Sequence, residues 1–390
     1  MGALSGYKIL DFSTLLPGPY ATMMLADLGA DVLKVSSKDR YDLVSNWGEK
    51  IEGTEITGPQ AWLGRNKKTI FLNLNVDKSI EAVKKLVKEY DIIVEQFRPG
   101  VMKKFSLDYE NLKKINDKII YCSITGYGQN GPMSMKAGHD INYISRAGVA
   151  YTSGKKLTGP SLYNFQIADV AGGSMNAVTS ILAAIIYREK TGKGQYVDVS
   201  MEDSVIPFNS MDGARYFVSG VEPSSESELL NGGSIYDFYE TKDHKYISVG
   251  ALEPKFFAAL CDMIGYKEWV DEKMLDKNLK FVKDTLINTF KLKTQGEWVE
   301  MSKKYDACIE PVMSLKECEK DEHLIKRGMF PELDVKEAKN KKIKQMGSPI
   351  KMSESPVEYK HAGYSEGYHT IEVLSNIGYS REEIKEMSGV

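Results

Sequence analysis

The alternation of strand and helix patterns along the first two hundred residues is the feature that most constrains this fold. Residues 7–12 alternate like a short strand, residues 20–28 have helical periodicity that ends at Gly29, and residues 32–35 form a second apolar run. Two strands joined by a helix normally lie parallel in one sheet, with the helix packed on a face. Further strand patterns fall at residues 69–74, 91–94, 118–125 and 195–200, and further helix patterns at residues 78–90 and 172–187. The sequence therefore predicts an α/β chain built on a parallel sheet of the nucleotide-binding type.

The length of the chain predicts more than one domain, because 390 residues exceed what a single ordinary core usually holds. Residues 220–233 are rich in Ser, Glu and Gly, which is typical of a linker. After them come strand patterns at residues 236–240 and 245–250, and helix patterns near residues 254–263, 280–290 and 295–304. We expect a large domain over residues 1–220 and a smaller α+β domain over 221–330, followed by residues 331–390.

Composition and charge argue against several classes of protein. The net charge is −3 and the pI is about 6.1, whereas nucleic-acid-binding domains usually carry a basic surplus, so no nucleic-acid partner is expected. The four cysteines lie far apart without a CxxC pair, which argues against a disulfide framework and against a zinc site. Residues 1–6 lack the features of a signal peptide, and no apolar run approaches the length that spans a membrane. We expect a cytoplasmic protein with no metal site and no membrane partner.

Two short stretches concentrate the candidate catalytic groups. Residues 138–143 place the titratable His139 in a loop, and residues 166–173 place Asp169 just before a pair of glycines that opens the helix pattern. An acid or base at a helix N-terminus, beside bare backbone N–H groups, can stabilise a developing oxyanion. We expect the N–H of Asp169 to serve in this way. On the residues alone, His139 could instead be a structural hydrogen-bonding residue, and Asp169 could be only an N-cap.

A set of basic residues follows predicted strands and could bind a phosphate-rich ligand. Arg40 lies in the long polar segment 36–59, Arg65 and Lys67 come soon after it, and Arg98 ends the strand pattern 91–94. Open α/β sheets place ligand contacts at strand ends, and guanidinium groups suit phosphate. The alternative interpretation of the first cluster is a solvated basic loop.

A glycine-rich stretch at residues 126–131 formally matches GxGxxG. A dinucleotide site is not expected there, because Pro132 follows at once, no long helix pattern opens, and no acidic residue stands at the ribose position about 20 residues later. We expect a glycine loop instead.

Short motifs stand along nearly the whole chain, at residues 17–19, 25–30, 97–102, 126–131, 138–143, 191–195, 232–233 and 250–254. Together they resemble those of the family III CoA-transferase superfamily, the CaiB/BaiF-like proteins. Within it the chain is most similar to the α-methylacyl-CoA racemases, on the strength of His139, the residues around it and Glu253. One departure is that residues 36–59 are longer than in typical racemases and resemble the transferases.

This resemblance implies an architecture that periodicity cannot reach. It implies a Rossmann-like large domain completed by the C-terminal residues 331–390, and a smaller α+β domain inserted between. It further implies an interlocked homodimer, with each site between the large domain of one subunit and the small domain of the other. No cofactor is expected beyond the CoA moiety of the acyl-CoA substrate. The residues expected to contact CoA are Arg40, Arg65, Lys67, Arg98 and Tyr143, although packing is the alternative for Tyr143.

The resemblance also defines the chemistry to be tested. A racemase would use His139 and Asp169 as an acid/base pair on the two faces of an enolate, and Glu253 would hydrogen-bond the imidazole and set its tautomer. A CoA transferase would instead use Asp169 as a nucleophile that forms an aspartyl-CoA thioester. His139 separates the two, because the transferase needs no base there. On the residues alone, Glu253 before Pro254 could be only a capping residue, and a non-catalytic acyl-CoA binder is the third hypothesis.

Overall fold

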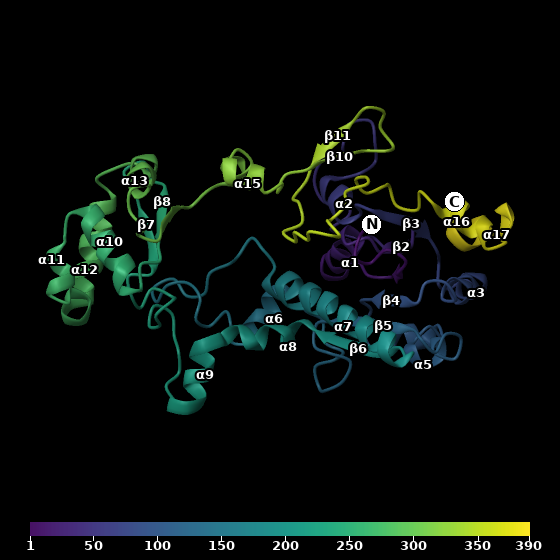
Figure 1. Cartoon of the computed structure of the whole chain (residues 1–390). Coiled ribbons are helices and arrows are strands. Elements are labelled where there is room, and N and C mark those ends of the chain that lie inside the picture. The colour runs from purple at the N-terminus through teal and green to yellow at the C-terminus, as the bar shows by residue number, and fades with distance from the viewer. The chain divides into compact units, whose positions relative to one another are not determined.

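A six-stranded, wholly parallel sheet organises the larger part of the chain and confirms the predicted α/β class (Figure 1). The strand order is β3-β2-β1-β4-β5-β6, so the connections run outward in both directions from β1. Ligands of open α/β sheets bind at the carboxyl ends of the strands beside such a reversal, here between β1 and β4. The strands are β1 (Lys8–Asp11), β2 (Asp31–Ser36), β3 (Lys67–Phe71), β4 (Ile92–Glu95), β5 (Ile120–Thr125) and β6 (Gln195–Ser200).

The computed structural model describes residues 1–390 and divides them into two units. The first unit comprises residues 1–147, 164–207 and 323–390, and the second comprises residues 148–163 and 208–322. The second unit thus begins earlier than the expected boundary at 220 and also takes in residues 148–163, a segment without a strong sequence pattern.

Helices of the first unit cover the parallel sheet. Strand β1 is buried, and residues such as Leu10 and Ile70 form one core with Val83 and Leu86 of α3. Helix α3 has the strongly amphipathic pattern that places its apolar side on such a core. The helices are α1 (Pro17–Asp27), α2 (Gly58–Leu63), α3 (Asp77–Leu86), α4 (Val101–Lys104), α5 (Tyr109–Leu112), α6 (Asp140–Arg146), a π-helix (Ile167–Ser174), α7 (Met175–Thr191) and α8 (Met201–Val205).

The C-terminal residues return to the first unit. Helix α16 (Thr370–Asn376) packs beside β3, and α17 (Arg381–Ser388) packs beside α3, so the yellow end of the chain lies against the purple and blue beginning (Figure 1). Leu374 and Met387 enter the same core as Leu10. Residues 332–344 of this part form a short antiparallel pair, β10 (Glu332–Asp334) and β11 (Lys342–Lys344).

The second unit is α+β, with a three-stranded antiparallel sheet in the order β7-β8-β9. Its core gathers apolar side chains from the sheet and from the long helices, including Ile247, Leu260, Leu286 and Trp298. Its elements are α9 (Ser210–Ser219), β7 (Asp237–Glu240), β8 (Tyr246–Val249), α10 (Pro254–Ile264), α11 (Glu268–Asp271), α12 (Met274–Phe290), α13 (Gln295–Ser302), β9 (Ile309–Pro311) and α14 (Leu315–Cys318); a 3-10 helix (Ile206–Asn209) and α15 (Glu322–Lys326) lie at its boundaries.

The π-helix and α7 form one continuous apolar helix of 25 residues, Ile167–Thr191. By length and composition alone this helix could cross a membrane, contrary to the expectation that no apolar run is long enough. A buried core helix has the same profile, and α7 packs against β5, β6 and α1 of its own unit. The sequence pattern missed its length because Asp169 and two glycines interrupt the apolar run.

Candidate functional site

A cavity of about 590 Å³ in the first unit brings His139 and Asp169 together. Both side chains line it with Gln166, which precedes the π-helix. The rest of its wall is mainly apolar and comes from segments far apart in sequence: Leu15, Leu16, Leu43, Val44, Gly58, Pro59, Trp62, Leu63, Ile343, Lys344, Gln345 and Met346. The two stretches singled out in the sequence therefore meet in space, in a pocket of a size that holds a small ligand.

Several hydrogen bonds fix the apolar wall beside α1. The backbone N–H of Leu15 donates to Asp42 Oδ2 (3.0 Å), which ties the segment after β2 to the loop after β1. The N–H of Gly18 donates to Gln96 Oε1 (3.0 Å), which ties the start of α1 to the end of β4. A Cβ at Gly18 would lie 2.1 Å from the Cβ of Ser13, so only glycine allows this close approach.

His139 stands at the N-cap position of α6, immediately before Asp140. The backbone N–H of His139 donates to Asn142 Oδ1 (3.0 Å), and His139 is exposed to solvent. An exposed imidazole that lines a cavity is open both to solvent protons and to a ligand, as an acid/base group requires.

Asp169 lies within the π-helix and is half-buried. Its backbone N–H and that of Ala168 both donate to Asp140 Oδ1, at 3.0 and 2.6 Å. The sequence-based prediction that the N–H of Asp169 stabilises an oxyanion is therefore at odds with the structure, because this donor is already used by Asp140. Sequence reasoning placed Asp140 beside His139 but missed its contact with Asp169, since a link of this range leaves no local pattern.

Close packing explains why residues 172 and 173 of the π-helix are glycines. A Cβ on Gly172 would lie 2.9 Å from Val205 Cγ1, and one on Gly173 would lie 2.8 Å from Met201 Cγ, so α8 packs directly on this backbone. The hydroxyl of Ser174 donates to the carbonyl of Pro17 (2.7 Å) and closes the π-helix onto α1. π-Helical segments are rare and are frequent at functional sites.

The environment of Asp169 favours its protonated form. Burial and, to a smaller extent, the negative charge of Asp140 together raise the pKa of Asp169 to about 7. Burial, followed by the nearby charge of Asp169, also raises the pKa of Tyr143. A carboxyl group with a pKa near neutrality can both give and take a proton at physiological pH.

Tyr143 differs from its expected role as a CoA contact. Its residue is only 5% exposed, and its hydroxyl donates to the carbonyl of Gly138 at 2.6 Å. Its ring lies edge-on to that of Tyr127, with centroids 5.1 Å apart. These contacts favour the alternative interpretation, in which Tyr143 is a packing residue.

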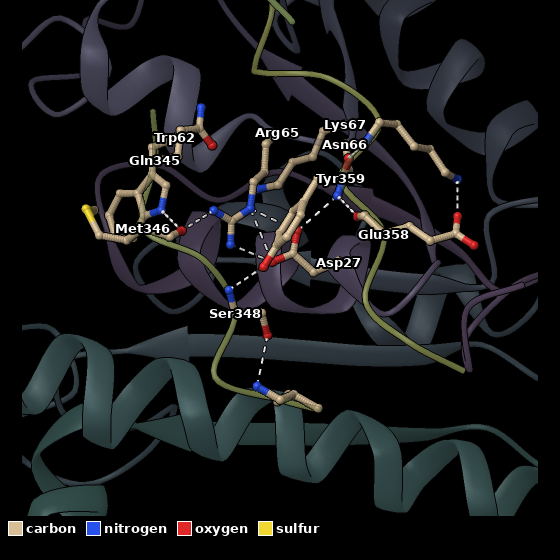
Figure 2. Close-up of polar contacts among 12 residues, drawn as sticks. Asp27, Trp62, Arg65, Asn66, Lys67, Gln345, Met346, Ser348, Glu358 and Tyr359 are labelled. Atoms are coloured by element: carbon tan, nitrogen blue, oxygen red, sulfur yellow. Dashed lines mark hydrogen bonds and ion pairs between the residues drawn. The ribbon is translucent and has the colours of Figure 1, made fainter. Parts of the chain in front are cut away.

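Arg65, also expected to contact CoA, is held in a buried ion pair with Asp27. It lies at the end of the sheet opposite to the carboxyl ends of the strands, where ligands of such sheets bind. It precedes β3, at the amino end of the parallel strands, and is 1% exposed. Figure 2 shows its guanidinium between Asp27 and Met346: Nε donates to Asp27 Oδ1 (2.9 Å), and Nη1 donates to the Met346 carbonyl (2.5 Å). Because Met346 lines the cavity, Arg65 supports its wall from behind, and its charge is not available to a phosphate.

Lys67 is equally enclosed. Its ammonium group donates to the carbonyl of Pro19 (2.8 Å) and the hydroxyl of Thr22 (2.7 Å), and lies 3.7 Å from Asp11 Oδ2. Burial lowers the pKa of Lys67 to about 7. The predicted strand at residues 69–74 already followed Arg65 and Lys67, but the prediction grouped these two residues with Arg40 after the preceding strand.

Arg40 and Arg98 do lie where a ligand of the sheet is expected. Arg40 follows β2 and stacks on Phe97, with its guanidinium carbon 4.6 Å from the ring centroid. Arg98 follows β4, is exposed, and lines a second cavity of about 380 Å³ with buried Glu95 on its floor. Both arginines stand at carboxyl ends of strands that flank β1.

Glu253 belongs to the second unit, where it is the N-cap residue of α10. Its backbone carbonyl accepts from the N–H groups of Phe256 and Phe257, at 3.0 Å each. Its predicted pairing with His139 of the first unit stays a prediction.

Comparison with known proteins places these features in a family. Residues 4–370 match CoA-transferase family III. The alpha-methylacyl-CoA racemase of Homo sapiens is 31% identical over 389 residues, covering 99% of this chain and 96% of that protein. The succinyl-CoA:glutarate CoA-transferase of Homo sapiens is 30% identical over 381 residues, covering 96% of this chain and 86% of that protein.

A solved structure has the same fold. The crystal structure of a CaiB/BaiF family protein from Brucella suis superposes with a TM-score of 0.84 at 25% identity, covering 96% of this chain and 99% of that one. Relatives with both isomerase and transferase names share the match, so it identifies the family and not one reaction. Because the agreement extends over nearly the whole length, the chain belongs to CoA-transferase family III.

Proposed function

We propose that this family III enzyme is a 2-methylacyl-CoA racemase, in which His139 and Asp169 move the α-proton of the substrate. The observation that carries the proposal is that these two groups line one cavity, and that the pKa of Asp169 is raised to about 7. General acid/base groups work best when their pKa lies near the operating pH.

The proton balance of the proposed reaction is simple. In one direction neutral His139 removes the α-proton, which leaves an enolate of the thioester, and protonated Asp169 returns a proton to the opposite face. The reverse direction starts from the histidinium and the aspartate carboxylate. Each group ends a turnover in the form that the other direction requires, and exchange with solvent restores the starting state. Two such groups typically contribute about 10²–10⁴-fold each.

Arg40 and Arg98 are the proposed contacts of the CoA phosphates. They are the two members of the expected basic set that stand at the carboxyl edge of the sheet, on either side of β1. Arg65 and Lys67 are left out of this role because both are buried and engaged with other groups. The mainly apolar wall around His139 suits the acyl part of the substrate.

Glu253 is the proposed hydrogen-bond partner of the His139 imidazole. In the proposed homodimer the two residues come from different subunits, as the family resemblance implies. Sedimentation at nanomolar concentration tests the assembly, and a folded monomer under those conditions would count against it.

A CoA transferase remains the second candidate, with Asp169 as its nucleophile. The long segment between β2 and α2 supports it, because that segment resembles the transferases more than typical racemases. The presence of His139 in the same cavity weighs against it, because a transferase needs no base there.

The deciding experiment is deuterium wash-in at the α-carbon of a chiral 2-methylacyl-CoA, with no carboxylic acid acceptor present. We expect exchange together with loss of optical purity. The parallel sample is treated with hydroxylamine and analysed by peptide mass, where Asp169 should be unmodified. A hydroxamate at Asp169 that forms as fast as turnover, without α-exchange, would assign the protein to CoA transfer.

A further inference from the structure

We propose that Tyr143 is a positioning residue for His139, and that it acts by holding the peptide group that joins Gly138 to His139. The inference rests on the proposed function, in which His139 serves one face of the enolate. Tyr143 was expected to contact CoA, and the inference assigns its hydroxyl to the backbone of Gly138 instead.

Both polar atoms of that peptide group are bound by residues of the same short helix. The Tyr143 hydroxyl donates to the Gly138 carbonyl oxygen at 2.6 Å, and the His139 N–H donates to Asn142 Oδ1 at 3.0 Å. Because a peptide group is planar, fixing its oxygen and its N–H fixes the plane from which the His139 side chain departs. The imidazole is left with its own side-chain torsions.

The ring of Tyr143 is itself clamped. A Cβ on Gly126 would lie 2.6 Å from Tyr143 Cε1, and one on Gly138 would lie 2.7 Å from the same atom. The two glycines therefore let the backbones on both sides close onto the ring, while Tyr127 packs against it edge-on. A buried ring with this little space carries its hydroxyl to one position, so the hydrogen bond to Gly138 has a fixed geometry.

The hydroxyl also stays a donor over the working range of pH. Burial and the charge of Asp169 raise the pKa of Tyr143, so the phenol keeps its proton in neutral and moderately alkaline solution. The titratable and charged groups that face it are Asp169, Tyr127 and Asp140.

The backbone of Asp169 has a separate support. Asp140 Oδ1 accepts the N–H groups of Ala168 and Asp169, whereas Tyr143 and Asn142 hold the His139 side. Loosening the Tyr143 contact should therefore disturb one acid/base group and spare the other. A general structural defect would disturb both.

The test is the Tyr143→Phe variant, which keeps the ring and removes only the hydroxyl. We expect α-proton exchange from the enantiomer that His139 serves to fall about 10-fold or more, since a small misplacement of a catalytic group has effects of this size. Exchange from the other enantiomer and the KM for acyl-CoA should stay close to those of the wild type. Tyr127→Phe, which removes a hydroxyl from the same ring pair but keeps the Tyr143–Gly138 bond, is the matched control.

Asn142→Ala is the second variant, because it releases the other atom of the peptide group from an exposed residue and does not threaten the core. It should show the same preference between enantiomers. Equal losses for both enantiomers, no loss in either variant, or a rise in KM at unchanged kcat for Tyr143→Phe would overturn the inference; the last result would restore Tyr143 as a CoA contact.

A readout without turnover separates this inference from the proposed reaction. The protein has five histidines, so the imidazole NMR signals of labelled protein can be assigned with His139→Ala. Tyr143→Phe should shift the His139 signal, and Tyr127→Phe should leave that signal unchanged. If wild-type protein shows no α-exchange, the racemase proposal fails, whereas an unmoved His139 signal in Tyr143→Phe means that the positioning role fails.

Discussion

Asp27 and Asp169 are both carboxyl groups that the first unit withdraws from water, and burial is the largest cause of the raised pKa of each. Their surroundings differ in what opposes that effect. Arg65, Asn66 and Lys67 all act to lower the pKa of Asp27. The charge that acts on Asp169 comes from Asp140 and raises its pKa further.

Asp27 is paired within the fold, whereas Asp169 has the pKa that acid/base chemistry requires. The Asp27–Arg65 pair repays part of its desolvation through ion pairing, and removing one partner leaves a charge buried without compensation. Asp169 lacks such a cation, so it sits in the cavity with a proton that it can give up near neutral pH. Groups perturbed in this way cluster at functional sites.

The largest expected effect comes from breaking the compensated pair. Arg65→Met should destabilise the protein by about 3–5 kcal/mol, because Asp27 would stay buried without its partner. Chemical denaturation at pH 7 measures the loss. The matched control is Lys68→Met, which breaks an exposed ion pair with Glu372 and should cost about 1 kcal/mol or less.

A different behaviour of Arg65→Met would show that Arg65 binds CoA and does not support the fold. If Arg65→Met unfolds like the wild type but has a raised KM for acyl-CoA, its guanidinium reaches CoA in solution, and the contrast with the arginines at the carboxyl edge disappears.

The next effect sharpens the contrast between buried and exposed arginines. Arg98→Ala should raise the KM for acyl-CoA by about 10-fold or more, since charge-assisted contacts to phosphate contribute roughly 1.5–3 kcal/mol. Its unfolding midpoint should stay near that of the wild type because Arg98 is exposed. Lys104→Ala, on the exposed side of α4, is the control for a general change in charge, and an unchanged KM in Arg98→Ala would remove Arg98 from the CoA site.

The parallel sheet could be predicted because its strands are short apolar runs separated by helices and glycine breaks. The strand at residues 195–200 was placed correctly to the residue, and the others to within a few residues. His139 and Asp169 were singled out because one is a titratable group in a loop and the other is a carboxyl group just before a pair of glycines that opens a helix pattern. The role of Arg65 could not be predicted, because its partners Asp27 and Met346 are far from it in sequence and only the tertiary fold brings them together. The link between Asp140 and Asp169 was missed for the same reason.

A smaller effect tests whether burying the ionised carboxylate of Asp169 destabilises the folded protein. The pKa of its carboxyl is about 7 in the folded protein, against a usual value of 3.8, so the folded state holds its proton more tightly than the unfolded state does. The contribution of Asp169 to stability should therefore fall as pH rises from 4 to 7, and Asp169→Asn should remove that contribution. We expect the variant to gain about 1–2 kcal/mol over the wild type above pH 7 and nothing near pH 4, with the shift discounted for partial exposure. A variant that is less stable at pH 7.5 would mean that the carboxylate is compensated after all.

The smallest effect isolates the contribution of Asp140. Asp140→Asn keeps an oxygen that can accept the N–H groups of Ala168 and Asp169 but removes the negative charge beside the Asp169 carboxyl. Because burial is the larger cause of the shift, we expect the pKa of Asp169 to fall only part of the way towards its usual value. In a racemase, the acid limb of the pH profile of kcat/KM should move to lower pH with it in the direction in which Asp169 removes the α-proton. A transferase should show the same move, since its nucleophile is also the ionised carboxylate. Asp140→Ala, which also removes the acceptor oxygen, should lower kcat further by freeing the Asp169 backbone. An acid limb that stays in place in Asp140→Asn would show that burial alone sets the pKa of Asp169, and the contrast with Asp27 would then rest only on the groups around Asp27.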